Sequence, residues 1–357
     1  MKKSIFLSFI FILIYQGISS QVILEANGPG NTYELINSIL ANAGKDVIEV
    51  PDCVHTTFGR HIDEVFDTDL NKNVFRFYAH VSPDNDRCKT FDRQRTEIKS
   101  YDSSPENLKA TIGETVAYKW KFKISDTFKP STSFTHIHQI KSVGGSYESI
   151  PMITLTLRKS SPDRLELRYT PTNDQNTLKT ADLDLFRGNW VEVYEKITFG
   201  DVGRYEIEIK NIATSQVIFT YANNSVDMWQ DGAEFARPKW GIYRSLNSPA
   251  DLQDEIVKFA DFSIEEITGS LSVDDLTSNA DQIVLFPNPA SHEVNFKNVT
   301  SDTYTSVELY DTFGRQIFIK NSLHQNKLNV SELSKGMYFV VFKKDTITTK
   351  VLKFVVE

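Results

Sequence analysis

The sequence predicts an all-β protein built as an antiparallel sandwich or jelly roll. From residue 74 to residue 267, short runs that alternate polar and apolar residues follow one another, with polar turns between them. Alternation with a period of two is typical of strands that bury one face. No helical repeats separate the runs, so consecutive strands are expected to pair directly as antiparallel neighbours.

The runs expected as strands can be named in chain order. They are VFRFYAHV (74–81), RTEIKSY (95–101), VAYKWKFKI (116–124), FTHIHQIK (134–141), MITLTLRK (152–159), RLELRYT (164–170), WVEVYEKITF (190–199), GRYEIEIK (203–210), KWGIYRS (239–245) and VKFADFSIEEI (257–267).

One short helix is expected before the first of these strands. The segment GNTYELINSILANAG, residues 30–44, places apolar side chains at Leu35, Ile36, Ile39 and Leu40, one face of a helix. Asn31 precedes this pattern and is a suitable N-cap.

The N-terminus has the layout of a secretory signal peptide, residues 1–20. Two lysines follow Met1, an apolar run extends from Ile5 to Tyr15, and small residues precede Gln21. The apolar run is too short to span a membrane as a helix, and no later segment is long enough. The mature chain is therefore expected to be exported and soluble.

The net charge of the chain limits the class of ligand that it can bind. The formal net charge of −8 argues against a nucleic-acid partner, but a local basic face can still bind an acidic polysaccharide.

Cys53 and Cys88 are the two cysteines of the sequence. In an oxidising compartment such a pair is expected to form a disulfide, which would contribute about 3–4 kcal/mol by the chain-entropy model.

Three of the expected strands carry rows of cationic or proton-active side chains. Residues two apart in a strand share a face. This places the rows Arg93, Arg95, Glu97, Lys99; His136, His138; and Arg237, Lys239, Gly241, Tyr243 on single faces. If the rows meet on one sheet, they form a groove suited to a polyanion.

Each row alone has an ordinary explanation. Alternating Arg and Lys is what a solvated sheet face looks like, and a His-x-His pair is also half of a zinc site. The third metal ligand at a recognisable spacing is missing from the sequence, so no metal is expected there. Gly241 could simply mark a bulge.

The C-terminal part resembles a known export signal. Residues 268–283 are small, polar and acidic and are interpreted as a linker. The motifs LFPNPASHEVNF, VELYDTFGRQIF, LNVSELSKGMYFVVF and KVLKFVVE follow it. In this order they resemble the C-terminal sorting domain of the Bacteroidetes type IX secretion system. The resemblance implies that residues 284–357 form a small β-sandwich read by that machinery, and that the chain is secreted or attached to the cell surface.

Residues 21–267 resemble the jelly-roll polysaccharide lyases, which share a concanavalin-like sandwich. Alginate lyases of this architecture carry an Arg-(Ser/Thr)-Glu-Leu-Arg strand, a Gln-Ile-His strand and a Lys-x-Gly-x-Tyr strand. RTEIK, HIH and KWGIY stand here in the same order. His136 replaces the glutamine of the alginate pattern and Lys99 replaces its second arginine. These departures favour a related substrate, ulvan, over alginate or glucuronan, which stay as alternatives.

The resemblance implies a β-elimination that leaves an unsaturated uronic acid at the non-reducing end. Removing a proton beside a carboxylate builds a second negative charge, which donors or cations must stabilise. That task is assigned to His136 and Arg95, with Gln139 as a candidate if the strand carries a bulge. Tyr243 and His138 are expected to share the roles of base and acid, with Lys239 and Arg95 favouring the phenolate. Arg93, Glu97, Lys99 and Arg237 complete the expected substrate-binding set.

Two other functions compete with the lyase. A non-catalytic carbohydrate-binding jelly roll would use the same cations without Tyr243 or His138. A glycoside hydrolase needs two carboxylates across the scissile bond, and ADLDLF and VEVYEK supply no convincing pair.

No cofactor is expected, although the acidic turn from Asp84 to Arg87 could hold a structural calcium ion. His55, His61 and His80 are expected to be structural or solvated.

Overall fold

The computed structural model describes residues 21–267 and most of the C-terminal part, namely 283–297, 299, 305–311, 315–320, 326–344 and 347–357. The predicted signal peptide and residues 268–282 of the predicted linker lie outside the described residues. The chain divides into two compact units, one ending at Thr268 and the other beginning at Gly269.

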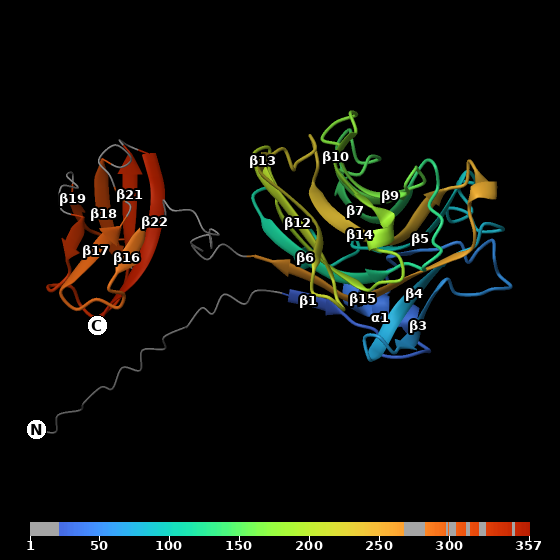
Figure 1. Ribbon diagram of the computed structural model, residues 1–357, viewed down its shortest axis with the longest axis horizontal. Coiled ribbons are helices and arrows are strands. Elements are labelled where there is room, and N and C mark those ends of the chain that lie inside the picture. Colours follow the sequence, from blue (N-terminus) through green and yellow to red (C-terminus); the bar gives the residue numbers. More distant parts are fainter. Residues whose placement is uncertain are drawn as a thin grey trace, which may run out of the picture. The chain divides into compact units, whose positions relative to one another are not determined.

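The first unit consists of two antiparallel sheets and one α-helix (Figure 1). Within residues 21–267, eight strands form one sheet in the order β13-β12-β11-β6-β15-β4-β3, with β1 paired to β15. These strands are β1 (Gln21–Leu24), β3 (Ile62–Asp67), β4 (Lys72–Ala79), β6 (Thr115–Lys123), β11 (Val191–Thr198), β12 (Gly203–Asn211), β13 (Val217–Val226) and β15 (Glu255–Glu266).

Seven strands form the second sheet in the order β10-β9-β8-β7-β14-β5-β2. They are β2 (Ile48–Glu49), β5 (Arg93–Lys99), β7 (Thr135–Val143), β8 (Ile153–Arg158), β9 (Arg164–Tyr169), β10 (Asn176–Asp182) and β14 (Phe235–Ser245). The central strand β14 lies between β5 and β7, so these three strands are direct neighbours.

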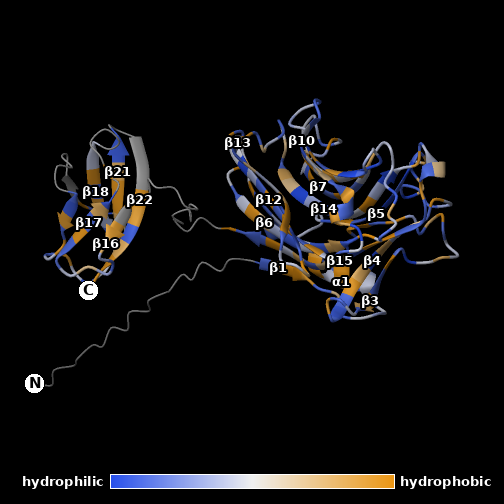
Figure 2. Cartoon of the chain, in the orientation of Figure 1, coloured by the Kyte–Doolittle hydropathy of each residue, from blue (hydrophilic) through white to orange (hydrophobic). Residues whose placement is uncertain are grey.

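The core lies between the two sheets. Apolar residues that alternate along the strands, such as Ile98 of β5, Trp120 of β6 and Trp240 of β14, are fully buried in one cluster. Hydrophilic and hydrophobic residues alternate along strands of both sheets (Figure 2). Burial of one row from each sheet is what holds a sandwich of this kind together. The predicted antiparallel jelly roll is confirmed.

The local predictions agree with most of these elements. Every run expected as a strand lies in or overlaps one, and α1 (Thr32–Leu40) is the expected helix, with Thr32, Ile36 and Leu40 buried. Asn31 occupies the N-cap position, but its side chain makes no cap hydrogen bond. Five strands of the first unit were not predicted: β1 and β2, which have four and two residues, β3, and β10 and β13, whose residues are largely exposed.

A bulge in β7 changes which residues share a face. The pairing of β7 with β8 shifts register between His136 and His138, and its pairing with β14 shifts between Trp240 and Tyr243. A bulge adds one residue to one strand and so reverses the side that later residues face. Beyond the bulge, Gln139 and Lys141 therefore face the same side as His136.

The second unit is also a small all-β fold. Among its described residues, one sheet has the order β16-β17-β20 and the other the order β19-β18-β21-β22. The strands are β16 (Val284–Phe286), β17 (Glu293–Lys297), β18 (Ser306–Asp311), β19 (Gln316–Lys320), β20 (Lys327–Asn329), β21 (Gly336–Lys344) and β22 (Ile347–Val356). Its core includes Val294, Leu309 and Val340. Across all described residues, no helix has the length and apolar character needed to cross a membrane.

Candidate active site

With the exception of His138, the predicted site residues of β5, β7 and β14 meet on the side of the seven-stranded sheet turned away from the core. In the register of these strands, Tyr243 lies opposite both Arg95 and His136, and Lys239 lies opposite both Lys99 and Gln139. We call this surface the polar face. It comprises Arg93, Arg95, Glu97, Lys99, His136, Gln139, Lys141, Arg237, Lys239 and Tyr243.

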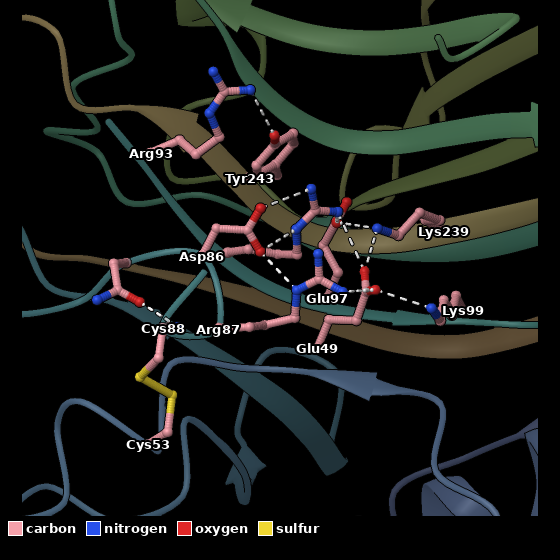
Figure 3. Close-up of polar contacts among 12 residues, drawn as sticks. Glu49, Cys53, Asp86, Arg87, Cys88, Arg93, Glu97, Lys99, Lys239 and Tyr243 are labelled. Carbon is pink, nitrogen blue, oxygen red and sulfur yellow. Dashed lines mark hydrogen bonds and ion pairs between the residues drawn. A yellow bond between two sulfur atoms is a disulfide. The ribbon is translucent and has the colours of Figure 1, made fainter. Parts of the chain in front are cut away.

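Tyr243 is surrounded by two guanidinium groups and two rings. Arg93 donates a hydrogen bond from Nη1 to the phenolic oxygen over 3.2 Å (Figure 3). The guanidinium of Arg95 lies 3.7 Å from the centre of the tyrosine ring. Phe134 and His136 pack against the same ring, with centroids 5.1 and 5.8 Å away. These contacts fix the tyrosine ring on the polar face, with its phenolic oxygen next to the guanidinium of Arg93.

His136 is a neutral imidazole on the polar face. Its pKa is lowered to about 3, mainly by burial; the charge of Glu97 opposes this shift and that of Arg95 adds to it. The ring stacks on Phe134 at 4.8 Å. Its Nδ1 atom is buried and has no hydrogen-bond partner among the described residues. A neutral ring with an unused nitrogen can donate a hydrogen bond to an anion without adding charge.

A network of carboxylates holds the cations in place (Figure 3). Arg95 donates to Glu97 over 2.6 Å and to Asp86 over 2.9 Å. Glu49, from the two-residue strand β2, accepts from Arg95, Arg87, Lys99 and Lys239. Burial opposes ionisation of Glu49, but these cations outweigh it and hold its pKa far below the usual range.

Glu97 is the second centre of this network. It is fully buried, pairs with Lys239 at 2.5 Å and accepts a hydrogen bond from Gln139 over 2.5 Å. Burial disfavours its charged form, but the charges of Lys239 and Arg95 reverse the effect and lower its pKa. Glu97 thus orients Arg95 and also fixes the amide of Gln139.

The network and the adjoining polar face carry more positive than negative charge. Seven cationic side chains face four carboxylates, an excess of three charges when Lys141 is protonated. The cations are Arg87, Arg93, Arg95, Lys99, Lys141, Arg237 and Lys239, and the carboxylates are Glu49, Asp86, Asp92 and Glu97. A chain of net charge −8 therefore concentrates positive charge at this one place, where it attracts an anionic ligand.

Arg237 is buried and incompletely paired, whereas Lys141 is partly exposed and donates to the carbonyl of Ser149 over 3.2 Å. Arg237 is 6% exposed, stacks over Tyr101 at 5.2 Å, and has two guanidinium nitrogens without a hydrogen-bond partner in the described part of the chain. Burial lowers the pKa of Lys141 to about 7, and the charges of Lys239 and Arg237 contribute. Buried donors without partners are costly, so an anion that accepts from them would bind favourably.

His138 does not belong to the polar face. The prediction that it shares a face with His136 is wrong, because the bulge turns it into the core. There its Nδ1 donates a hydrogen bond to the carbonyl of Lys239 over 2.9 Å, its Nε2 lies 2.8 Å from Glu195 Oε2, and the ring packs on Trp120. His138 is fully buried, so the role of acid or base expected for it is withdrawn.

Gly241 is required where β14 crosses β5. Its φ of 149° is unfavourable for side chains, and an added Cβ would lie 2.1 Å from the carbonyl oxygen of Thr96. Any other residue would push the two strands apart. Gly241 therefore keeps Tyr243 in register with Arg95.

The predicted disulfide between Cys53 and Cys88 is present. It closes next to the turn that carries Asp86 (Figure 3). The backbone amide of Cys88 donates to the side chain of Asn85 over 2.7 Å. The calcium site considered at Asp84–Arg87 is not supported. Asp86 is engaged by Arg87 and Arg95, and Asp84 by histidines.

Comparison with known proteins identifies the C-terminal unit. The model of the secretion system C-terminal sorting domain matches residues 284–357. These residues are a sorting domain. Domains of this family are read by the type IX secretion machinery, so the chain is exported to the cell surface or beyond.

The remaining comparisons concern the jelly roll. No curated protein matches the sequence. The solved structures it resembles include an endo-β-1,4-glucuronan lyase from the fungus Trichoderma reesei, with 14% identity over 68% of this chain and 94% of that chain and a TM-score of 0.43. A PL-14 alginate lyase from Aplysia kurodai has 12% identity over 69% and 99% of the two chains and a TM-score of 0.46. An alginate lyase from Pseudomonas aeruginosa has 15% identity over 57% and 85%, with a TM-score of 0.39. At such low identities, the proposed function rests on the geometry of the site.

Proposed function

We propose that the chain is a secreted polysaccharide lyase that cleaves a uronate-containing anionic polysaccharide by β-elimination. The observation that carries the proposal is the position of the Tyr243 side chain. Its hydroxyl accepts a hydrogen bond from Arg93, Arg95 stacks on its ring, and the neutral ring of His136 lies beside it. Such surroundings suit a proton carrier next to a carboxylate-binding site.

The polymer would lie across the polar face with its carboxylates among the cations. His136 would donate from its unpartnered Nδ1 to the carboxylate of the uronate at the cleavage point. The buried donors of Arg237, together with Lys141, would bind a neighbouring anionic group. Neutralising the uronate carboxylate makes its neighbouring C5 proton acidic enough to remove.

Tyr243, as a phenolate, would then remove the C5 proton. The electron pair of the C5–H bond forms the C4=C5 double bond, and the C4–O bond breaks with its electrons passing to the leaving oxygen. The tyrosine hydroxyl returns the proton to that oxygen. One residue can serve both steps when the proton and the leaving group lie on the same face of the sugar. The proposed reaction therefore does not need His138, which lies in the core.

Lys239 receives a different role from the predicted one. Its ammonium pairs with Glu49 and Glu97 and is 2% exposed, so it organises the carboxylate network that holds Arg95. Lys99 likewise donates a hydrogen bond to Glu49. Both contribute positive charge to the face rather than direct chemistry.

Ulvan is the polymer that we propose first, with glucuronan and alginate as alternatives. His136 at the position of the alginate-type glutamine and Lys99 at that of the second arginine both support a substrate other than alginate. An excess of cations over carboxylates is compatible with a polymer that carries sulfate as well as carboxylate.

A panel of polymers tests this proposal. The full chain, with its disulfide intact, is incubated with ulvan, glucuronan, alginate and heparin while ultraviolet absorbance of the unsaturated product and reducing ends are both followed. We expect absorbance to rise with one polymer. Reducing ends without that absorbance would indicate a hydrolase, and retention of a polymer in an affinity gel with neither signal would indicate a binding module.

A further inference from the structure

A second cluster of polar groups lies outside the polar face, beside the disulfide. His55, His61, His80 and Asp84 each offer one ligand atom, and these atoms all lie within 4.8 Å of one another. His55 lies in the loop after Cys53, His61 directly before β3, His80 directly after β4 and Asp84 in the turn that precedes Cys88. We propose that this cluster is a zinc-binding site with three imidazole ligands and one carboxylate ligand. The proposal does not depend on the lyase activity.

The three rings converge on one carboxylate. Asp84 Oδ1 lies 2.8 Å from His55 Nδ1 and 3.1 Å from His61 Nε2, and its Oδ2 lies 3.0 Å from His80 Nδ1. A tetrahedral zinc ion with bonds of about 2.0–2.2 Å holds its ligand atoms about 3.4 Å apart. The three distances to Asp84 are slightly below this value and all the ligand atoms lie within 4.8 Å of one another, so small side-chain movements would bring all four ligands onto one ion.

The surroundings of His61 fit a metal ligand. Its other ring nitrogen, Nδ1, lies 2.7 Å from Asp52 Oδ1, and Asp52 also accepts a hydrogen bond from Tyr33 over 2.8 Å. A carboxylate that binds the second nitrogen of a histidine fixes the tautomer in which Nε2 is free to bind metal. One Zn²⁺ together with the carboxylates of Asp52 and Asp84 is also electrically neutral, which suits a buried place.

The site is enclosed but can be reached from solvent. The side chains of His61 and Asp84 are fully buried, whereas those of His55 and His80 are 17% and 16% exposed. Phe58 packs on the three histidine rings, with its centroid 4.4–5.3 Å from theirs. An apolar cover of this kind controls solvent access to a bound metal. Imidazole ligands select zinc and similar transition metals over calcium.

The site would fix the turn that positions Arg95. Asp84 is followed by Asn85, whose carbonyl accepts from the amide of Arg95 over 3.4 Å, and by Asp86, which accepts from the Arg95 side chain. The disulfide anchors the other end of this turn at Cys88. Zinc at Asp84 and the disulfide at Cys88 would thus hold both ends of the segment that orients a site arginine.

The test measures metal binding in the full chain, purified without a histidine tag. The double variant His55→Gln/His80→Gln removes the two partly exposed ligands and leaves buried His61 and Asp84 in place. His292→Gln, an exposed histidine of the C-terminal unit, is the matched control. Each protein is stripped with a chelator, incubated with zinc chloride, dialysed and analysed for zinc, and its thermal unfolding is recorded with and without the metal.

We expect one zinc ion per chain in the natural protein and in the control, and a large loss in the double variant. Zinc should raise the unfolding temperature of the first two proteins only, because a ligand stabilises the state that binds it. Cobalt(II) bound to the natural protein should give the intense visible bands of four-coordinate cobalt. Equal zinc content in all three proteins, or an unfolding temperature of the natural protein that zinc does not change, would overturn the proposal. The cluster would then be a network of hydrogen bonds only.

Discussion

At the scale of single residues, Lys141 links the proposed binding to pH. Because burial lowers its pKa to about 7, Lys141 carries its charge below that pH and loses it above. A polyanion binds the charged form of Lys141 more tightly. The apparent affinity of the protein for the polyanion should therefore fall roughly fivefold as the pH rises from about 6 to about 8, because the loss of one ion pair costs about 1 kcal/mol. The measurement is KM, or Kd in an affinity gel, across this range.

Arginine at the same position removes this pH dependence. Lys141→Arg keeps its charge throughout the range, so its affinity should stay flat where that of the natural protein declines. Lys45→Arg, an exposed lysine before β2, should behave as the natural protein does. A decline of the same size in Lys141→Arg would show that another group is responsible.

Substitutions of the two histidines in THIHQ should affect catalysis in one case and stability in the other. His136→Ala should lower kcat by roughly 10²–10⁴ with little change in the free energy of unfolding, because the ring lies in the site and its Nδ1 has no partner among the described residues. His138→Ala should instead lower the free energy of unfolding by about 1–3 kcal/mol, since it leaves Glu195 buried with one hydrogen bond fewer. Denaturant titration and initial rates on the same two variants distinguish the effects. The reverse pattern would place His138, not His136, at the reacting sugar.

At the scale of elements, the two-residue strand β2 supplies a carboxylate that pairs with four cations. β2 contributes Glu49 to four cations, so Glu49→Gln leaves a buried cluster with uncompensated positive charge. Removing one partner of a buried charge network costs about 3–5 kcal/mol, and we expect a loss of that size in urea titration. Glu106→Gln, whose side chain is 90% exposed, should change stability by less than about 0.5 kcal/mol. Equal effects of the two substitutions would mean that solvent or counter-ions replace Glu49 without cost.

The sequence was sufficient to place β5, β7 and β14 as strands, and insufficient to predict the bulge in β7. Period-two alternation identifies Arg95, Glu97, Lys239 and Tyr243 as one surface because these strands are regular near the site. It fails at His138, because one inserted residue in β7 reverses the face and leaves no local mark in the letters FTHIHQIK.

Other parts of the site depend on contacts distant in sequence. Glu49 lies 190 residues from Lys239 along the chain, and a strand of two residues carries no periodicity. The histidine cluster combines three short segments whose proximity follows only from the folded sheets and the disulfide. Pairings of this kind are set by tertiary structure and not by local pattern.

At the scale of the whole molecule, the disulfide stabilises a region rich in loops. It joins residues 35 apart, and the chain-entropy model gives a contribution of about 3–4 kcal/mol. Cys53→Ser/Cys88→Ser should therefore lower the free energy of unfolding by that amount, measured in urea, and reductant should have no further effect on the variant. A loss below about 1 kcal/mol would show that the flanking contacts hold the loop without the covalent bond.

The measurement that tests the central claim most directly is the mass of the products released from the polymer cleaved in the panel, for the full chain and for Tyr243→Phe. Elimination predicts fragments that end in an unsaturated uronate and are one water lighter than hydrolysis products. Tyr243→Phe should release them more slowly by roughly 10²–10⁴, while Tyr194→Phe on the other sheet releases them at the natural rate. Fragments that have gained a water, or an undiminished rate in Tyr243→Phe, would contradict the account.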